Sequence, residues 1–569
     1  MLRSLFFGDN LDVLRDEIAR ESVDLVYLDP PFNSKRSYNL LFRSPSGDES
    51  DAQITAFEDT WHWGPQAERE FDELLHQPNT QVAEMMRAFR SFLGENDVMA
   101  YLTMMANRLL ELHRVLKPTG SLYLHCDPTA SHYLKVVLDG VFGKENYRSE
   151  ISWKRSSAHS DARQGRKIYG NIRDVLFFYT KGKKWSWNWI YSEYDEEYVE
   201  GFYRHVKSGS ERRYRIGDLT AAKPGGDTSY DWQVKRGPKL DWEADLKDEF
   251  LTPKTGWIYK GVNPYKGRFW AYSKANMANF AHQGRLIHSS SGIPQYKRYL
   301  DEMPGVPLQN NWDDIRPAGG KEYLGYPTQK PLALLERIVQ ASSNEGDVVL
   351  DPFCGCGTAV HAAELLKRQW IGIDVTHLAI SLIEKRMGDA FPDIDFEVHG
   401  TPKDFSGAQD LAARDKYQFQ WWVCSLVNAQ PYQGRKKGAD RGIDGLIFFR
   451  DDNKGAKKII VSVKGGQNVG VGMVRDLIAV VEREKADIGL FVTLAEPTQT
   501  MIAEAASAGF YEAKAYKRKF QCIQILTVRE LLEGSKRPEY INVDADIGHK
   551  RARRETTAHR GHVEMELEK

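Results

Sequence analysis

Residues 23–32 read VDLVYLDPPF, and this stretch decides the fold of the chain. The apolar run Val23–Leu28 predicts a buried strand of the kind found in parallel sheets. The motif Asp29-Pro30-Pro31-Phe32 follows it, at the edge where open α/β sheets bind their ligands. Because proline fixes φ and has no N–H, this loop is rigid and offers mainly acceptors. A plain turn that ends the strand is the alternative interpretation.

The groups in this loop suit a flat heterocycle that carries an amino group. The Asp29 carboxylate and the Pro30 carbonyl can accept hydrogen bonds from the amine, while the Phe32 ring can stack on the heterocycle. The motif therefore indicates a site that binds and orients an aromatic amine.

Strands and helices alternate around this motif in two separate parts of the chain. In the first part, strands are expected at 5–7, 23–28 and 121–125 and helices at 11–19, 98–116 and 132–138, with an irregular insertion at 33–97. In the second part, strands are expected at 348–350 and 371–373 and helices at 331–341, 358–366 and 377–387. This alternation predicts an α/β fold with a mostly parallel sheet.

The second motif, DPFCGCGT at residues 351–358, lies between an expected strand and an expected helix. Its glycines let the backbone approach a ligand closely, and the following helix N-terminus favours ligand oxygens. A dinucleotide site requires G-x-G-x-x-G, but Val360 occupies the third glycine position. Asp374 ends the next expected strand, where an acid can accept hydrogen bonds from ribose hydroxyls. Cys354 and Cys356 are interpreted as small packing residues.

Composition indicates the environment of the protein. The 569 residues include five cysteines with no C-x-x-C pair and no zinc spacing, which indicates reduced thiols in a cytoplasmic protein. The N-terminal apolar run is too short for a signal peptide, and no apolar stretch of about 18 residues predicts a membrane helix.

Charge is segregated along the chain although the net charge is only −1. Residues 151–320 carry 28 Lys and Arg against 20 Asp and Glu, and residues 401–569 carry 28 against 23. Residues 151–320 also hold nine of the 14 tryptophans. Two basic segments, one of them rich in aromatic residues, suit a polyanion held by phosphate contacts and stacking. Trp185, Trp187 and Trp189 alternate at period two, which predicts one buried face of a strand.

These motifs and their order resemble a known family. Three motifs are similar to the S-adenosylmethionine site of DNA amino-methyltransferases: Phe353-x-Gly355-x-Gly357, Thr328-Gln329-Lys330-Pro331 and Gly8-Asp9-Asn10. A fourth, Asp29-Pro30-Pro31-Phe32, is similar to the catalytic motif of these enzymes. The catalytic motif comes first along the chain, the basic insert second and the cofactor motif last. This order is similar to the permuted order of the β group of DNA amino-methyltransferases, which includes the modification subunits of type III restriction systems. The resemblance covers residues 1–390 and implies a Rossmann-like methyltransferase fold with an inserted target-recognition domain.

The resemblance implies methyl transfer from S-adenosylmethionine to an exocyclic amine in double-stranded DNA. Asp29 favours adenine N6, because cytosine-N4 enzymes of this family usually carry serine there, and cytosine N4 is the alternative target. The resemblance assigns catalysis to Asp29, Pro30, Pro31 and Phe32, and cofactor binding to Asp9, Asn10, Lys330, Pro331, Asp351, Phe353, Cys354, Gly355, Gly357, Thr358 and Asp374. A second copy of the chain or a restriction subunit is a further candidate partner.

A separate pair of residues marks the C-terminal region. Asp444, in the run GADRGIDGLI at 438–447, and Lys464, which ends the apolar part of the expected strand 459–466, resemble the PD-(D/E)-x-K site of Mrr-like restriction endonuclease domains. The resemblance implies that Asp444 binds a divalent metal, with Mg²⁺ as the candidate, together with the Val463 carbonyl. Lys464 would then orient water or stabilise developing charge.

One residue departs from that pattern. Ser462 stands where the family usually has Gln or Glu, two residues before the lysine, and serine is a weak metal ligand. Gln418, Gln420 or Gln467 are candidates to compensate. A domain that binds DNA or a partner without cutting is the alternative.

The sequence thus predicts six segments. They are a catalytic half at 1–150, a target-recognition insert at 151–320, a cofactor-binding half at 321–395, a linker at 396–416, a restriction endonuclease-like α/β domain at 417–545 and a disordered tail at 546–569.

Overall fold

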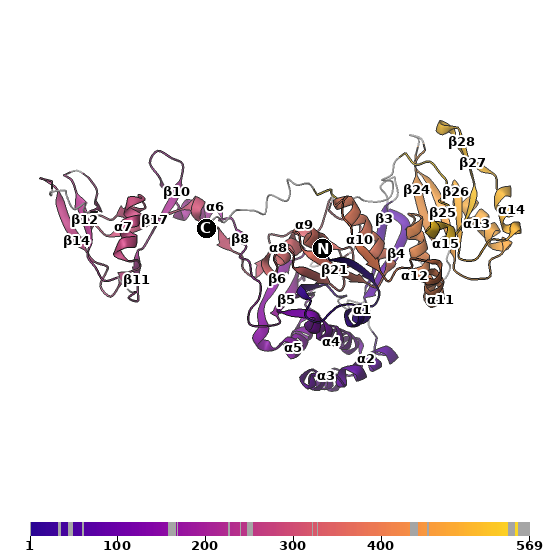
Figure 1. Ribbon diagram of the computed structural model, residues 1–569, viewed down its shortest axis with the longest axis horizontal. Helices are drawn as coiled ribbons and strands as arrows, with labels where there is room; N and C mark the ends of the chain where they lie inside the picture. The colour runs from indigo at the N-terminus through magenta and orange to yellow at the C-terminus, as the bar shows by residue number, and fades with distance from the viewer. Residues whose placement is uncertain are drawn as a thin grey trace. The chain divides into compact units, whose positions relative to one another are not determined.

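The fold is known from a computed structural model (Figure 1). It describes residues 2–31, 36–43, 49–59, 62–156, 167, 169–225, 228–238, 240–246, 254–320, 322–326, 328–432, 442–451, 455–543 and 552–555. The chain forms two compact units, one made of Met1–Asn188 with Gln309–Lys569 and the other of Trp189–Leu308.

A nine-stranded sheet organises the first unit. Its strands, in spatial order, are β19 (Asn311–Trp312), β6 (Tyr147–Lys154), β7 (Arg173–Thr180), β5 (Leu116–Cys126), β2 (Val23–Leu28), β20 (Val348–Asp351), β21 (Gln369–Asp374), β1 (Arg3–Phe7) and β22 (Glu397–His399). The strands β5, β2, β20, β21, β1 and β22 each pair in parallel with the next strand in this order, whereas β7 is antiparallel to both β5 and β6. The predicted mostly parallel α/β sheet is confirmed.

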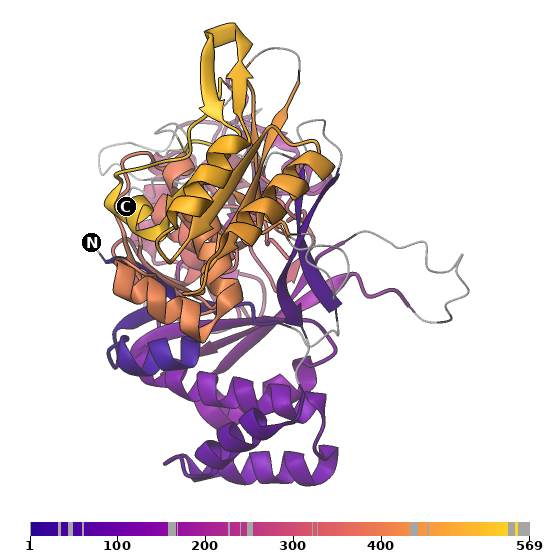
Figure 2. The ribbon, with the colours of Figure 1, turned by 90° about the vertical axis from the view of Figure 1, so that its right-hand side faces the viewer.

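Helices cover both faces of this sheet, as Figure 2 shows. One layer consists of α1 (Asn10–Asp16), α2 (Pro65–Leu75), α3 (Thr80–Leu93), α4 (Asp97–Val115) and α5 (Ser131–Phe142). The other consists of α8 (Leu332–Ser342), α9 (Thr358–Leu365) and α10 (His377–Ala390). α2 and α3 pack on α4 and α5, and the other helices bury an apolar face toward the strands, as is usual for a parallel sheet covered on both faces.

The insertion at 33–97 contains more regular structure than the sequence predicts. β3 (Arg36–Arg43) and β4 (Glu49–Asp59) form an antiparallel pair, and α2 and α3 follow. The two helices bury Phe71 and Leu74, and Val82 and Met86, in the core beside α4. The expectation of an irregular segment was therefore wrong, because these short apolar faces gain their stability from α4 rather than from local sequence.

The second unit is a small, mixed domain of short strands. Its sheets combine β16 (Leu286–His288), β17 (Pro294–Tyr299), β10 (Arg213–Gly217) and β9 (His205–Val206), and separately β13 (Glu243–Ala244), β12 (Trp232–Arg236) and β14 (Ile258–Val262). Two-residue pairs join β11 (Thr220–Ala221) to β15 (Phe269–Trp270) and β18 (Val306–Pro307) to β8 (Tyr191–Ser192), and the helices are α6 (Glu196–Phe202) and α7 (Lys274–His282). Trp232 and Trp270 are buried at the centre of its core.

The insert is shorter than the expected 151–320. β6 and β7 belong to the nine-stranded sheet, and β19 returns to that sheet beside β6. The compact insert is therefore Trp189–Leu308. The predicted strand at the three alternating tryptophans is also wrong, since residues 185–190 adopt no regular structure and the Trp189 side chain is 63% exposed. Trp187 instead stacks on Phe178.

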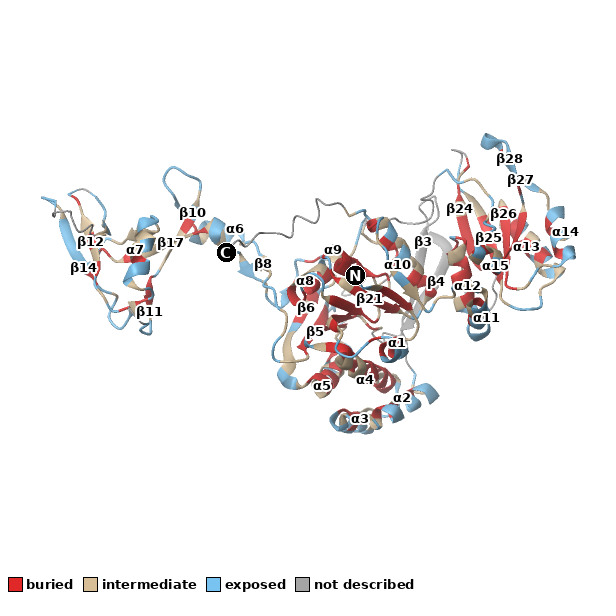
Figure 3. Ribbon diagram, viewed as in Figure 1, coloured by how far each residue is buried: buried red, intermediate tan, exposed pale blue. Residues whose placement is uncertain are grey.

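The C-terminal domain is a second α/β layer structure. Its sheet contains β23 (Gln430–Pro431), β24 (Gly445–Phe449), β25 (Lys457–Lys464), β26 (Ile488–Thr493) and β29 (Ile523–Thr527). One face packs against α11 (Phe405–Arg414), α12 (Lys416–Leu426) and α15 (Val528–Glu533), and the other against α13 (Val471–Arg483) and α14 (Gln499–Ser507). Figure 3 shows the buried strands between exposed helix surfaces.

Two boundaries at this end differ from the prediction. The expected linker at 396–416 contains β22, which pairs with β1, and α11, which contributes Ala408 and Leu411 to the C-terminal core. Of the tail at 546–569 the structure describes only residues 552–555, and these are not disordered: Ala552 packs against the α8–α10 layer, and Glu555 pairs with His361 at 3.2 Å. Among the described residues, no helix has the length and apolar character needed to cross a bilayer.

Candidate active site

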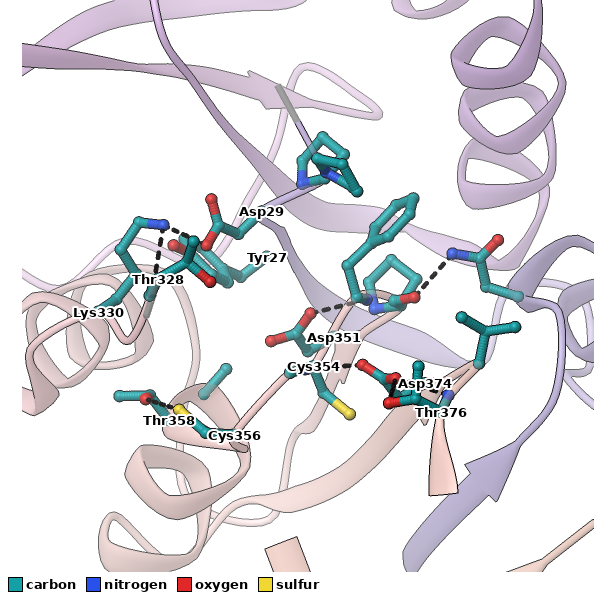
Figure 4. A pocket seen from close by; sticks show the side chains of 18 of the residues that line it. Tyr27, Asp29, Thr328, Lys330, Asp351, Cys354, Cys356, Thr358, Asp374 and Thr376 are labelled. Carbon is teal, nitrogen blue, oxygen red and sulfur yellow. Dashed lines mark hydrogen bonds and ion pairs between the residues drawn. The ribbon is translucent and has the colours of Figure 1, made fainter. Parts of the chain in front are cut away.

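A cavity of about 300 Å³ lies where four adjacent strands of the large sheet end (Figure 4). β2, β20, β21 and β1 are parallel neighbours, so the loops after them meet at one edge. Asp29 and Asp351, from the two predicted motifs, therefore line the same cavity although they come from opposite ends of the sequence.

Asp29 is held by a lysine from the cofactor half. Lys330 Nζ forms an ion pair with Asp29 Oδ2 and also donates to the Thr328 carbonyl at 3.4 Å. Asp29 Oδ1 is buried and has no hydrogen-bond partner among the described residues. A buried carboxylate oxygen without a donor is energetically costly, so this atom is prepared for a donor from a ligand.

A buried network stands behind Asp29. Tyr27 Oη lies 3.0 Å from His125 Nδ1, and His125 Nε2 lies 3.2 Å from Asp174 Oδ2, with all three side chains buried. Burial alone would raise the pKa of Asp174, but the hydrogen bond from His125 holds it below its usual value. Burial and the nearby Asp29 raise the pKa of Tyr27, so it is a neutral phenol that donates to His125. Sequence reasoning missed this network because its members lie on three different strands.

Asp374 organises the glycine-containing loop at residues 351–358, which is the predicted cofactor loop. Its Oδ2 accepts the Gly355 N–H at 3.0 Å, and its Oδ1 accepts the N–H and hydroxyl of Thr376, both at 2.9 Å. Burial raises the pKa of Asp374 to about 6, although these hydrogen bonds oppose the shift. Burial also raises the pKa of Asp351 well above its usual range, with the Phe353 N–H opposing.

The glycines of the cofactor loop are required by its backbone. Gly355 and Gly357 have φ of +49° and +74°, in the left-handed region that favours glycine. A Cβ on Gly357 would lie 2.8 Å from the side chain of Ile383, and one on Gly355 would lie 3.2 Å from the ring of Tyr326. The loop can therefore keep its shape only with both glycines.

Two buried arginines, which the sequence did not reveal, hold the loops in place, and Arg108 itself lines the cavity. Arg108 on α4 makes a bidentate pair with Asp9 at 2.9 and 3.0 Å and donates to Asn10 Oδ1 at 2.5 Å. Arg386 on α10 donates to the Cys356 carbonyl and to Thr358 Oγ1, both at 3.0 Å. An arginine inside an amphipathic helix pattern gives little local signal, since its partners lie far away in the sequence.

Most predicted cofactor residues meet at this cavity. Lining residues from the prediction are Asp9, Asn10, Lys330, Asp351, Phe353, Cys354, Gly355, Thr358 and Asp374, together with Asp29, Pro30 and Pro31. Pro331 instead caps α8, and Gly357 shapes the loop without lining the cavity. Phe32 lies outside the described residues.

Both loop cysteines are buried packing groups. Burial raises the pKa of the Cys354 and Cys356 thiols, so both are protonated. Within the part of the chain that the structure describes, no group of three or more His, Cys, Asp or Glu side chains could hold a metal ion.

The C-terminal domain places Asp444 at the start of β24, beside β25. Asp444 Oδ2 accepts the Val463 N–H at 2.7 Å, and Oδ1 accepts from Gln420 Nε2 at 3.0 Å. Lys464 ends β25, and Ser462 is buried on the same strand. Asp444 thus contacts the Val463 backbone through its N–H, and the predicted joint binding of a metal by Asp444 and the Val463 carbonyl stays a prediction.

Only one of the three candidate glutamines lies beside Asp444. Gln420, on α12, contacts the carboxylate directly. The Gln418 oxygen accepts the backbone N–H of His377, and Gln467 is exposed. Of the three candidate glutamines, Gln420 is therefore the one that contacts the Asp444 carboxylate, through its amide nitrogen.

Comparison with known proteins identifies the family. Residues 23–385 match the DNA methylase family, and the chain belongs to it. Residues 411–535 match a restriction endonuclease family. The resemblance expected from the sequence is confirmed for both parts.

Individual relatives match part of their own length. The type II methyltransferase M.EcaI of Enterobacter cloacae is 32% identical over 289 residues, 50% of this chain and 57% of that protein. The Mod subunit of the type III restriction-modification enzyme StyLTI of Salmonella typhimurium is 25% identical over 375 residues, 64% of this chain and 50% of that protein. The DNA adenine methyltransferase YhdJ of Escherichia coli is 48% identical over 106 residues, 18% of this chain and 34% of that protein. The chain thus spans about half the length of the first two of these curated relatives.

The raised pKa of Asp374 predicts pH-dependent cofactor binding. Its carboxylate takes up a proton near pH 6 and then loses acceptor capacity toward Gly355 and a ribose. We expect the dissociation constant of S-adenosylmethionine to rise as pH falls from about 8 to about 5, measured by calorimetric titration. Asp374→Asn should bind more weakly and with a flatter pH dependence. An equally steep dependence in that variant would assign the effect to another group.

Proposed function

We propose that this chain transfers a methyl group from S-adenosylmethionine to adenine N6 in double-stranded DNA. The observation that carries the proposal is Asp29 Oδ1, a buried acceptor without a partner among the described residues, at the rim of the cofactor cavity. The cavity fits the cofactor chemically, because Asp374 and the backbone of the 355–358 loop offer polar groups to a ribose and a carboxylate tail.

The residues around the cavity perform three tasks. Asp29 Oδ1 and the Pro30 carbonyl accept the two N–H groups of the target amine and localise its lone pair. Lys330 fixes Asp29 through the other oxygen, so only one oxygen is presented to the amine. The glycine loop and Asp374 hold the cofactor so that its sulfonium methyl, the chemistry that S-adenosylmethionine supplies, faces the amine in line.

The target base must leave the duplex to reach this cavity. An amino group in a base pair is already hydrogen-bonded, so the base is flipped out and bound singly. Adenine is favoured over cytosine because Asp29 opens the motif and because one relative is named a DNA adenine methyltransferase. Mod subunits of type III enzymes are also among the relatives, which supports a restriction subunit as partner and a role on cellular DNA in the cytoplasm.

Removal of the Asp29 carboxylate should separate catalysis from cofactor binding. We expect Asp29→Ala to lose about 100-fold or more in methyl transfer rate, the range for removing one transition-state hydrogen bond, while its S-adenosylmethionine affinity stays near wild type. Asp127→Ala, at the end of the neighbouring strand β5 and outside the cavity, is the matched control. Loss of cofactor binding in parallel with activity would contradict this division of roles.

The identity of the base is tested by mass analysis of nucleosides. DNA from cells that express the wild-type chain should contain N6-methyladenine, and DNA from cells with Asp29→Ala should lack it. N4-methylcytosine as the sole product would overturn the adenine assignment, and no methylated base at all would overturn methyl transfer.

The C-terminal site supports a second activity, metal-dependent DNA cleavage. Mg²⁺ keeps several waters and is bound through one or two carboxylates plus substrate phosphates. Asp444 supplies one carboxylate, and rotation of the Gln420 amide places a second oxygen beside it. A metal held there would polarise a phosphate and activate water, and Lys464, which has no ion-pair partner among the described residues, would meet the developing charge.

Plasmid cleavage distinguishes a nuclease from a binding module. We expect Mg²⁺-dependent cleavage of unmethylated plasmid by the wild-type chain, its loss in Asp444→Ala and Lys464→Ala, and a clear reduction in Gln420→Ala. Gln467→Ala, an exposed glutamine of the same domain, should cleave normally. If the wild type leaves the plasmid intact under these conditions, the domain binds DNA or a partner without cutting.

A further inference from the structure

A two-stranded hairpin extends from the C-terminal domain. It consists of β27 (Phe510–Ala513) and β28 (Arg518–Gln521), and Figure 2 draws it as an arm beyond the five-stranded sheet of its own domain. Among the described strands, β27 and β28 pair with each other and with no third strand, so the hairpin is separate from that sheet.

One face of the hairpin is anchored on the domain, from the middle of its strands to the residue before the turn. Ala513 and Phe520 are buried in the domain core, and Tyr511 packs edge-on against Phe449. The Tyr511 hydroxyl donates to Asp451, whose other carboxylate oxygen pairs with Lys457. Burial and the hydrogen bond to Asp451 raise the pKa of Tyr511 to about 12, so this anchor persists at neutral pH.

The turn and the second strand of the hairpin carry an excess of positive charge, since Glu512, opposite Lys519 in the strand register, is the only acidic residue of the hairpin. Lys514, Lys517, Arg518 and Lys519 are all exposed, and none of them forms an ion pair with a carboxylate of a described residue. An ordinary solvated surface interleaves both signs of charge. Four cations within six residues repel one another instead, and this self-repulsion is relieved by a bound polyanion.

Exposed aromatic rings accompany these cations. Phe510 is 62% exposed and Tyr516, in the turn at the tip, is 48% exposed. Large exposed rings beside uncompensated Lys and Arg suit contacts with a nucleic acid backbone and its sugars more than plain hydration.

We propose that the β27–β28 hairpin is a binding arm for the phosphate backbone of duplex DNA, distinct from the Asp444 site. A two-stranded ribbon is narrow enough to enter the major groove, which is about 12 Å wide. Because one face of the hairpin is anchored on the domain, the hairpin presents its cations at a low entropic cost of ordering when DNA binds. This inference rests on the proposed function in one respect: it takes DNA, the proposed substrate of the chain, as the bound polyanion.

The salt dependence of DNA binding tests this proposal. Titration of the full-length chain with a labelled duplex over a range of KCl concentrations gives the slope of log affinity against log salt. Each lost phosphate contact reduces that slope by about 0.9, so we expect a reduction of about 2 to 4 in a quadruple variant. The variant is Lys514→Gln, Lys517→Gln, Arg518→Gln and Lys519→Gln.

A matched variant removes the same number of exposed cations elsewhere. It carries Lys403→Gln, Lys416→Gln, Lys485→Gln and Arg537→Gln. Both variants should unfold at the wild-type temperature, and at saturating DNA both should methylate at the wild-type rate. An unchanged slope in the hairpin variant, or an equal loss in the matched variant, overturns the proposal. Absence of methylation in the wild type would refute the methyltransferase proposal while leaving the slope comparison intact.

Discussion

The parallel pairing of β2 with β20 is the constraint on which the active site depends. Leu25 faces Val349 and Val26 faces Leu350, so the strands that precede Asp29 and Asp351 end at the same edge. β21 and β1 extend this edge and add Asp374 and Asp9. The order of the motifs along the chain does not affect the geometry, because parallel strands need only be neighbours in space.

Two buried arginines and one partly buried lysine fix the side chains and loops along this shared edge. Arg108 joins α4 to the loop after β1, Arg386 joins α10 to the glycine loop, and Lys330 joins the start of α8 to Asp29. Arg108 and Lys330 form ion pairs with Asp9 and Asp29, whereas Arg386 donates to the Cys356 carbonyl and the Thr358 hydroxyl. These contacts hold the carboxylates in place before any ligand binds, and such preorganisation is the main source of electrostatic catalysis.

The sequence predicts the parts of this molecule whose signals are local. Apolar runs such as Val23–Leu28 locate the central strands, and the positive φ of Gly355 and Gly357 explains why their spacing marks the cofactor loop. Arg108 gives no comparable signal, since it contacts Asp9 only after folding. The insert boundary was misplaced because β6 and β7 share the basic and aromatic composition of the insert while packing in the large sheet. The strand predicted from the alternating tryptophans at 185–189 is absent for a similar reason. Alternation of apolar residues predicts a buried face only where a partner strand exists.

A structure of the full chain with S-adenosylmethionine bound tests the central claim most directly, that the two motifs form one site. The account predicts the ribose hydroxyls within hydrogen-bond distance of the Asp374 carboxylate and the sulfonium methyl directed toward Asp29 Oδ1. A cofactor bound outside this cavity, or one whose methyl group faces away from Asp29, would contradict it.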